Sequence, residues 1–210
     1  KMLGLLNLAG FGFKAWDRNS FDPDKPFSYA STEVPVYDRN LKALAEKIRP
    51  TCVLAHVRGV PYSTEGVISR QNVHPFQFPG CRITLAHNGD LARFAEMKPH
   101  LLASIRPEFV NLIRGTTDSE WIYALLVSHL EDPTRYATAE EIVRAVEKTL
   151  AVIRDTRARL GIALSSPVNL FITTGNQLAA VRYCFDFGCY RTDDPVQVQE
   201  ANFTYYSLWY

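Results

Sequence analysis

The spacing of apolar residues predicts two long amphipathic helices from the middle of the chain onward, each with a stripe at three- and four-residue spacing. The stripes comprise Ile122, Leu125, Leu126, His129 and Leu130 in the first helix, and Ile142, Ala145, Val146, Thr149, Leu150 and Ile153 in the second. A capping box, in which a hydroxyl precedes a carboxylate by three residues, is expected at the start of each helix. The two pairs are Thr117 with Glu120 and Thr138 with Glu141. Gly161 is expected to end the second helix.

Segments of β character lie on both sides of this helical block. They span residues 10–16, 51–57, 82–86, 168–174 and 177–183. The first alternates glycine with aromatic residues, so another backbone is expected to approach it closely, and the second is interpreted as a buried strand because it is nearly all apolar. Gly175-Asn176 fits the tight turn of a hairpin between the last two. Strands around a helix block, without βαβ alternation, indicate one α+β layered domain.

Composition and charge exclude several classes of function. The formal net charge of +1 gives no global electrostatic case for a nucleic-acid partner or an anionic membrane surface. No apolar run approaches the roughly 20 residues that span a bilayer. The four cysteines, Cys52, Cys81, Cys184 and Cys189, lack the close pairing of a metal finger, and no secretion signal accompanies them. We therefore expect free thiols, a cytoplasmic location, and neither a metal site nor a cofactor.

Polar side chains gather where predicted strands end and where the first long helix begins. Arg58 follows one strand, Asn88-Gly89 follows another, and Asp118 opens the helix. Each has an ordinary structural interpretation when taken alone: a solvated charge, a hairpin turn, and a carboxylate favoured by the helix dipole. The histidines just before Arg58 and Asn88 fit core histidines with hydrogen-bond partners.

Taken together, these segments form an ordered series of four short motifs. The series is Ala55-His56-Val57-Arg58, Asn72-Val73-His74-Pro75-Phe76, Ala86-His87-Asn88-Gly89 and Gly115-Thr116-Thr117-Asp118-Ser119-Glu120. Its order and spacing resemble the signature of the class II glutamine amidotransferases. Two further segments, Asp38-Arg39-Asn40-Leu41 and Val181-Arg182-Tyr183, resemble the small stand-alone branch that includes the glutathione-degrading and ergothioneine-biosynthesis amidohydrolases.

The resemblance implies a four-layer αββα sandwich of the Ntn-hydrolase type and a role for each site residue. Members of the family attack the amide of glutamine or a γ-glutamyl compound with an N-terminal cysteine whose own α-amine is the base. The side chain of Asn88 and the backbone N–H of Gly89 are expected to stabilise the oxyanion. Arg58 is expected to bind the α-carboxylate and Asp118 the α-ammonium. His74 is expected to belong to the substrate-binding site, where it shapes the loop over the pocket.

Three departures from the family pattern qualify this expectation. The chain begins with Lys1 and has no cysteine near it, so we expect the nucleophile upstream. Residues 7–12 differ from the glycine-rich run that is usual there. Pro61 replaces a threonine, for which Ser63 or Thr64 is a candidate substitute. With the aromatic run at 205–210, the ends suggest a single domain over 1–210 that lacks its native N-terminal segment and part of its C-terminus.

Three hypotheses follow. The first is an enzyme that hydrolyses glutamine or another γ-glutamyl small molecule, with either a partner subunit or a homo-oligomer left open. The second is a catalytically inactive Ntn-fold module that binds a glutamyl ligand or regulates a partner protein. The third is an Ntn hydrolase for another amide, against which the pairing of Arg58 with Asp118 argues because it matches an amino-acid head group.

Overall fold

The computed structural model describes residues 5–6, 9–61, 68–190 and 192–199. Its strands are β1 (Leu5–Leu6), β2 (Phe11–Trp16), β3 (Phe27–Ser31), β4 (Cys52–Val57), β5 (Val60–Pro61), β6 (Thr84–Gly89), β7 (Ser166–Thr173) and β8 (Leu178–Phe185). Its labelled α-helices are α1 (Arg39–Ala45), α2 (Phe94–Leu102), α3 (Pro107–Val110), α4 (Asp118–Ser128) and α5 (Ala139–Arg159), and a further short helical segment spans residues 195–199. Two single turns of 3-10 helix, η1 (Pro35–Tyr37) and η2 (Arg70–Asn72), precede α1 and β6.

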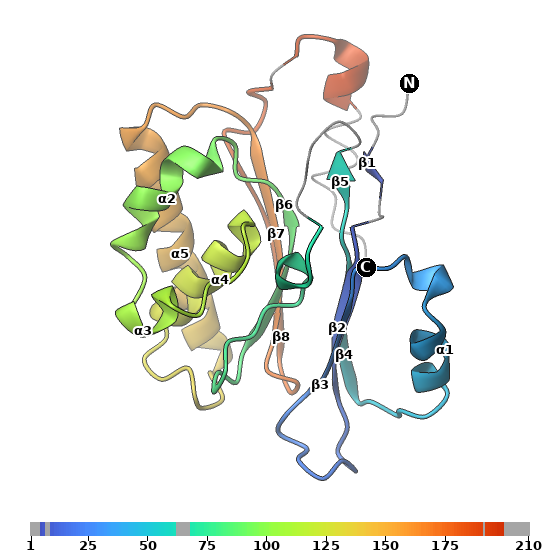
Figure 1. Ribbon diagram of the computed structural model, residues 1–210. Coiled ribbons are helices and arrows are strands. Elements are labelled where there is room, and N and C mark those ends of the chain that lie inside the picture. Colours follow the sequence, from blue (N-terminus) through green and yellow to red (C-terminus); the bar gives the residue numbers. More distant parts are fainter. Residues whose placement is uncertain (1–4, 7–8, 62–67, 191, 200–210) are drawn as a thin grey trace.

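One sheet has the strand order β6-β7-β8, with antiparallel neighbours, and helices cover one of its faces (Figure 1). The apolar stripes of α4 and α5 pack against alternate residues of β7 to form the main core. Its central strand contributes Val168, Leu170 and Ile172, all with no exposed surface. The predicted hairpin joins β7 to β8, with Gly175 in a left-handed conformation at φ 89°. The sheet thus lies on a continuous hydrophobic layer.

The other sheet has the strand order β3-β2-β4 and much thinner cover. Of the labelled α-helices in the described part of the chain, α1 alone lies beyond it (Figure 1), and this short helix buries none of its residues. Val53 and Val57 of β4 are consequently 52% and 45% exposed. The prediction that 51–57 forms a buried strand was therefore wrong for its outer face, although the strand itself is present. A third, two-stranded pairing joins β1 to β5.

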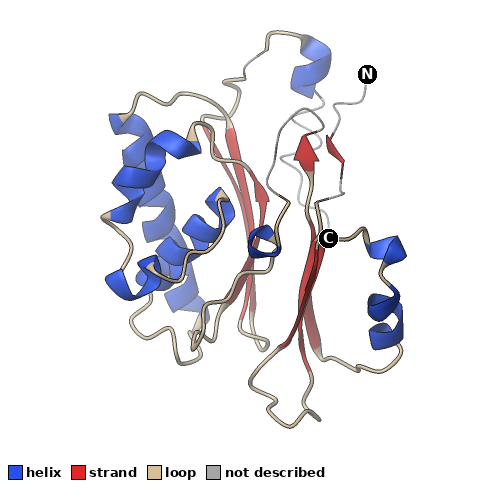
Figure 2. Cartoon of the chain, viewed as in Figure 1, coloured by secondary structure: helices blue, strands red, loops and turns tan. Residues whose placement is uncertain are grey.

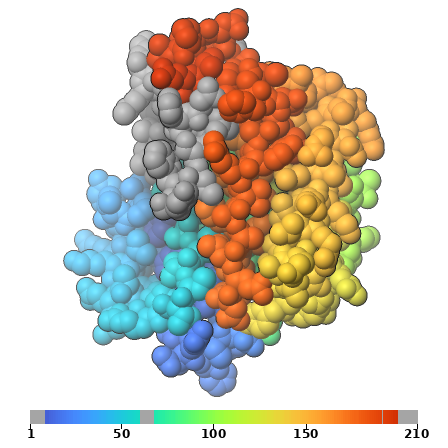
Figure 3. All heavy atoms as spheres, turned by 180° about the vertical axis from the view of Figure 1, so that it is seen from behind, coloured from blue at the N-terminus to red at the C-terminus, as the bar shows by residue number. Residues whose placement is uncertain are grey.

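The inner faces of the two main sheets lie against each other. Cys52 of β4 and Thr173 of β7 approach to 3.8 Å between sulfur and hydroxyl oxygen. A Cβ on Gly175 at the hairpin tip would lie 2.5 Å from the ring of Trp16, so the hairpin is in close contact with β2. The layers run helices, sheet, sheet, helix (Figure 2), which confirms the predicted αββα fold class. From behind, the orange C-terminal strands separate the yellow helical half from the blue and cyan half (Figure 3).

The helix starts show where local sequence signals were sufficient and where they were not. At α5 the capping box is complete, because Thr138 and Glu141 each accept a backbone N–H from the other residue. At α4 the Thr117 hydroxyl accepts from the Glu120 N–H, but the Glu120 carboxylate turns away from Thr117. The capping box predicted there is only half formed, because the Glu120 carboxylate accepts the backbone N–H groups of Arg114 and Gly115 instead. Gly161, at φ 60°, follows the last turn of α5 as expected.

Candidate functional site

The structure brings most of the predicted site residues to one end of the two facing sheets. Asn88 and Gly89 end β6, and Arg58 directly follows β4. Asp118 is the first residue of α4, and its carboxylate accepts the backbone N–H of Leu91, two residues beyond Gly89, at 2.7 Å. Burial lowers the pKa of Arg58, and the charge of Asp118 opposes this shift, so the two groups lie within electrostatic reach.

The Gly89 backbone faces the edge of β6 that lies opposite β7. On that edge Leu85 exchanges two backbone hydrogen bonds with Phe76, at 2.8 and 3.1 Å, whereas Asp90 donates to Pro167 of β7 at 3.1 Å. Successive N–H groups along a strand point to alternate sides. The N–H of Gly89 is therefore directed away from β7, toward the side on which Leu85 meets Phe76.

Glycine is required at position 89 by close packing. A Cβ there would overlap the carbonyl oxygen of Pro167 and lie 2.6 Å from the ring nitrogen Nε2 of His87. Any side chain would push β6 and β7 apart at the end of the ladder. The structure thus gives position 89 a packing reason for glycine that holds without a ligand. Gly12 shows the close backbone approach predicted for the first strand, because a Cβ there would overlap the His74 carbonyl oxygen.

A buried polar layer supports the loop that leads into α4, and motif reasoning did not assign its members. Asn72, which is fully buried, accepts the Thr116 N–H at 2.8 Å and donates to the Thr116 hydroxyl at 3.0 Å. The Glu120 carboxylate accepts the N–H groups of Arg114 at 3.0 Å and Gly115 at 2.6 Å. These four bonds fix the position of the first turn of α4 and hence of its carboxylate.

Three histidines meet where β4, the loop before β6, and β6 itself come together. The rings of His56 and His74 lie 4.2 Å apart, and His74, which precedes the cis peptide to Pro75, is 4% exposed. Burial, together with the neighbouring charges of His87 and Arg58, lowers the pKa of His56 to about 4. Burial likewise lowers the pKa values of His74 and His87. All three rings are therefore neutral at physiological pH.

His74 lies behind the candidate site, within the wall between the sheets. It packs on His56 and on the ring of Phe76 and is almost completely enclosed. Arg58, Asn88, Gly89 and Asp118, by contrast, are partly or fully exposed. The arrangement combines accessible groups at the surface with a buried histidine layer behind them. His74 is thus too enclosed in this structure to contact a ligand directly, and its role in shaping the loop stays a prediction.

The described cysteines are all free thiols. Cys81 lies in the main core beside Tyr123, and burial raises the pKa of its thiol. Cys52 faces Thr173 between the sheets, and Cys184 lies 3.3 Å from the Ser165 hydroxyl. A buried thiol of raised pKa is a poor nucleophile, so Cys81 does not suit catalysis.

Some residues named in the sequence analysis lie outside the described part of the chain, and two other expectations concerned a metal site and a membrane-spanning segment. Residues 7–8, Ser63, Thr64 and the run 205–210 are not described, whereas Pro61 pairs with Leu5 across β5 and β1. The described residues contain no group of three or more His, Cys, Asp or Glu side chains that is placed to hold a metal ion. Within the same ranges, no helix combines the length and apolarity that crossing a membrane requires.

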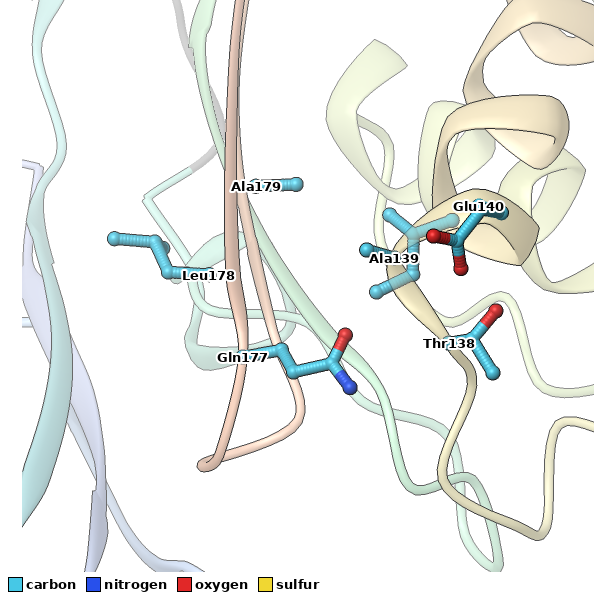
Figure 4. A pocket seen from close by; sticks show the side chains of 7 residues that line it. Thr138, Ala139, Glu140, Gln177, Leu178 and Ala179 are labelled. Carbon is cyan, nitrogen blue, oxygen red and sulfur yellow. The ribbon is translucent and has the colours of Figure 1, made fainter.

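A separate cavity of about 500 Å³ lies between the start of α5 and the start of β8 (Figure 4). Thr138 and Glu140 line it on one side, and Gln177 and Leu178 on the other. It contains none of the predicted site residues. Its helix N-terminus carries two glutamates and a completed capping box, which leaves no bias toward an anionic ligand.

Comparisons with known proteins agree with the motif series. The profile for class II glutamine amidotransferases matches residues 21–204. The chain is 32% identical to the probable glutamine amidotransferase DUG3 of Saccharomyces cerevisiae, covering 85% of this chain and 52% of that protein. It is 28% identical to a glutamine–fructose-6-phosphate aminotransferase of Shouchella clausii, covering 62% and 19%. The chain thus spans about half the length of the first relative and far less of the second.

One solved structure shows the same fold. A glutamine aminotransferase class-II domain protein from Silicibacter pomeroyi superposes with a TM-score of 0.55 at 23% identity. The match covers 83% of this chain and 69% of that one.

Proposed function

Because the chain belongs to the class II glutamine amidotransferases, we propose that it hydrolyses the γ-glutamyl amide of glutamine or of a related small molecule. The products are glutamate and ammonia or an amine. The observation that carries this proposal is the convergence of Arg58, Asn88, Gly89 and Asp118 at one end of the facing sheets. These residues come from three separate segments of the chain, and together they provide both charges needed for an amino-acid head group.

The two charged residues hold the head group. The planar guanidinium of Arg58 binds the α-carboxylate through paired N–H donors, and the carboxylate of Asp118 binds the α-ammonium. Partial burial of Arg58 strengthens its interaction with an anion, because less water competes for the donors. A substrate that lacks either charge leaves one of these side chains unpaired, which gives selectivity for the glutamyl group.

The end of β6 stabilises the reacting carbonyl. The backbone N–H of Gly89 is directed to the edge of the strand opposite β7, and the exposed side chain of Asn88 supplies a second donor. Two fixed donors lower the energy of a tetrahedral oxyanion without reorganisation during the reaction. This arrangement suits acyl transfer from an amide.

The nucleophile in this proposal is an N-terminal cysteine of the kind that members of the family use. Its thiolate attacks the γ-carbonyl carbon, and its α-amine takes up the thiol proton and passes it to the leaving amine. Water then hydrolyses the γ-glutamyl thioester and releases glutamate. Among the described thiols, Cys81 is unsuited to this role because burial raises the pKa of its thiol.

The test is a glutaminase assay on protein whose N-terminus has been established by intact mass and N-terminal sequencing. Asn88→Ala should lower kcat by about 10² to 10³, because it removes one oxyanion donor. Asp118→Asn keeps the shape of the side chain and should mainly raise KM for glutamine. The matched control is Asp155→Asn, an exposed aspartate on α5, which should leave both constants unchanged.

Two results would contradict the proposal. One is the absence of glutamate release from glutamine and from γ-glutamyl peptides by protein that carries the N-terminal cysteine. The other is normal turnover in both the Asn88→Ala and the Asp118→Asn variants. Binding of a glutamyl ligand without turnover would instead support the inactive-module hypothesis.

A further inference from the structure

We propose that Ser119 and His87 are positioning residues that orient the Asp118 carboxylate toward the α-ammonium of the ligand. This inference rests on the proposed function, since it concerns the same head-group site. Neither residue needs to touch the ligand. Both are buried, at 4% and 2% exposure, directly behind the partly exposed Asp118.

The geometry is a short chain of hydrogen bonds that ends on the carboxylate. The ring nitrogen Nδ1 of His87 lies 2.9 Å from the Ser119 hydroxyl oxygen. That hydroxyl donates to Oδ1 of Asp118 at 3.2 Å, and the Leu91 N–H donates to Oδ2 at 2.7 Å. Each carboxylate oxygen therefore has one fixed donor inside the protein.

The direction of the chain follows from the available protons. An ionised carboxylate can only accept, so the single hydroxyl proton of Ser119 must be given to Asp118. With the Ser119 proton donated to Asp118, the 2.9 Å contact to His87 requires a proton on Nδ1 of the ring, and this tautomer is part of the proposal. His87 is 2% exposed, and the Nε2 edge of its ring lies against the backbone of Gly89 and Pro167, which restricts its orientation. The strand thus fixes the ring, the ring fixes the hydroxyl, and the hydroxyl fixes the carboxylate.

Two fixed donors restrict rotation of the carboxylate and leave its remaining lone pairs for the ligand. Without the Ser119 hydroxyl, only the Leu91 N–H holds the group, and the carboxylate can turn about its terminal torsion, which is intrinsically soft. Burial prevents bulk water from replacing the lost donor easily. The consequence is a weaker grip on the α-ammonium with little effect on the rest of the ligand.

The experiment measures binding of two probes by titration calorimetry: L-glutamate, and glutarate, which lacks only the α-ammonium. The wild-type protein should prefer glutamate, and Asp118→Asn should abolish that preference. Ser119→Val should reduce the preference by about tenfold, the size expected for losing a hydrogen bond to a charged group. Ser119→Thr has the same shape as the valine variant but keeps the hydroxyl, and it should retain the preference.

A second pair of variants tests the histidine. His87→Asn keeps an N–H donor near the position of Nδ1 and should retain most of the preference, whereas His87→Leu should reduce it. Thermal unfolding of each variant shows whether it is folded, and Ser119→Ala replaces the valine variant if that one is unfolded.

The outcomes separate the two proposals. An unchanged preference in a folded Ser119→Val or Ser119→Ala protein overturns the positioning chain. Equal weakening of glutamate and glutarate also overturns it, because it indicates a general structural defect. If the wild-type protein itself binds the two probes equally, the head-group site fails and the proposed function fails with it.

Discussion

The two sheets of the molecule differ sharply in how they are covered. β6, β7 and β8 lie under α2, α3, α4 and α5 (Figure 1), and the alternate residues of β7 that face those helices are completely buried. β2, β3 and β4 lie beside one short helix, and the outer side chains of β4 remain about half exposed. The candidate site takes Asn88, Gly89 and Asp118 from the well-covered half and only Arg58 from the other.

This difference indicates that the two halves have different tasks. Buried apolar surface contributes about 25 cal/mol per Å² to stability, so most of the folding free energy comes from the helical half. The same half carries the proposed oxyanion donors at the end of β6 and holds Asp118 through hydrogen bonds from Leu91 and Ser119. The thinly covered half contributes the guanidinium of Arg58. The contact between the two halves includes the buried histidine layer and the loop that carries Asn72.

The largest expected effect is acid weakening of the contact between the halves. The unfolded chain takes up a proton on His56 below its ordinary pKa of 6.5, but the folded chain does so only near 4. Stability is therefore complete above pH 6.5 and is lost as the pH falls toward 4. The loss is on the order of 3 kcal/mol for His56 alone, and the lowered pKa values of His74 and His87 act in the same direction.

Urea unfolding at about pH 7.5 and about pH 5 measures this dependence. His56→Gln should flatten it, because glutamine does not titrate in this range. His100→Gln, which changes an exposed histidine of α2, is the control and should leave the slope as it is. If the unfolding free energy changed with pH equally in the wild-type and His56→Gln proteins, His56 would be ruled out as the source of the pH dependence.

A matched pair of valines tests the difference in cover directly. Val168→Ala, in the fully buried strand of the helical half, should cost about 2 to 3 kcal/mol of unfolding free energy through lost burial and a residual cavity. Val53→Ala, on the outer face of β4, should cost under about 0.5 kcal/mol, as exposed sites usually do. Equal costs in urea titrations would mean that the two sheets are equally well packed in solution.

Removal of the Asn72 side chain, which holds Thr116 through two hydrogen bonds, should cost less stability than Val168→Ala. Asn72→Ala leaves the Thr116 N–H and hydroxyl without their partner, which should cost about 1 to 2 kcal/mol. Because that loop positions Asp118, the variant should also raise KM for glutamine more than kcat falls. Unchanged stability and kinetics would show that the loop is held by Glu120 alone.

The sequence was sufficient for features that depend on local chemistry. The capping box at Thr138, the stop at Gly161 and the turn at Gly175 all rely on residues close together in the chain, and the structure has them. The half-formed box at Thr117 could not be foreseen, because the Glu120 carboxylate is drawn to Arg114 and Gly115 by a loop conformation that Asn72 helps to fix. Likewise, an apolar run cannot reveal that β4 has only a short helix over it.

The candidate site shows the same division. Motif order selected Arg58, Asn88, Gly89 and Asp118, and their roles in substrate binding and catalysis stay predictions. The residues behind them lay inside the same motifs, but nothing in the one-dimensional pattern distinguished them. Ser119 acquires a role only when α4 places its hydroxyl between the ring of His87 and the carboxylate next to it.

The central claim is that a glutamyl head group binds at the end of β6, between Arg58 and Asp118. An NMR titration of nitrogen-15-labelled protein with L-glutamate tests it most directly. Binding at this site should give saturable shifts of the backbone N–H signals of Gly89 and Leu91 and of the side-chain Nε–H signal of Arg58. Shifts confined to the cavity around Thr138 and Gln177, with those three signals unmoved, would contradict it.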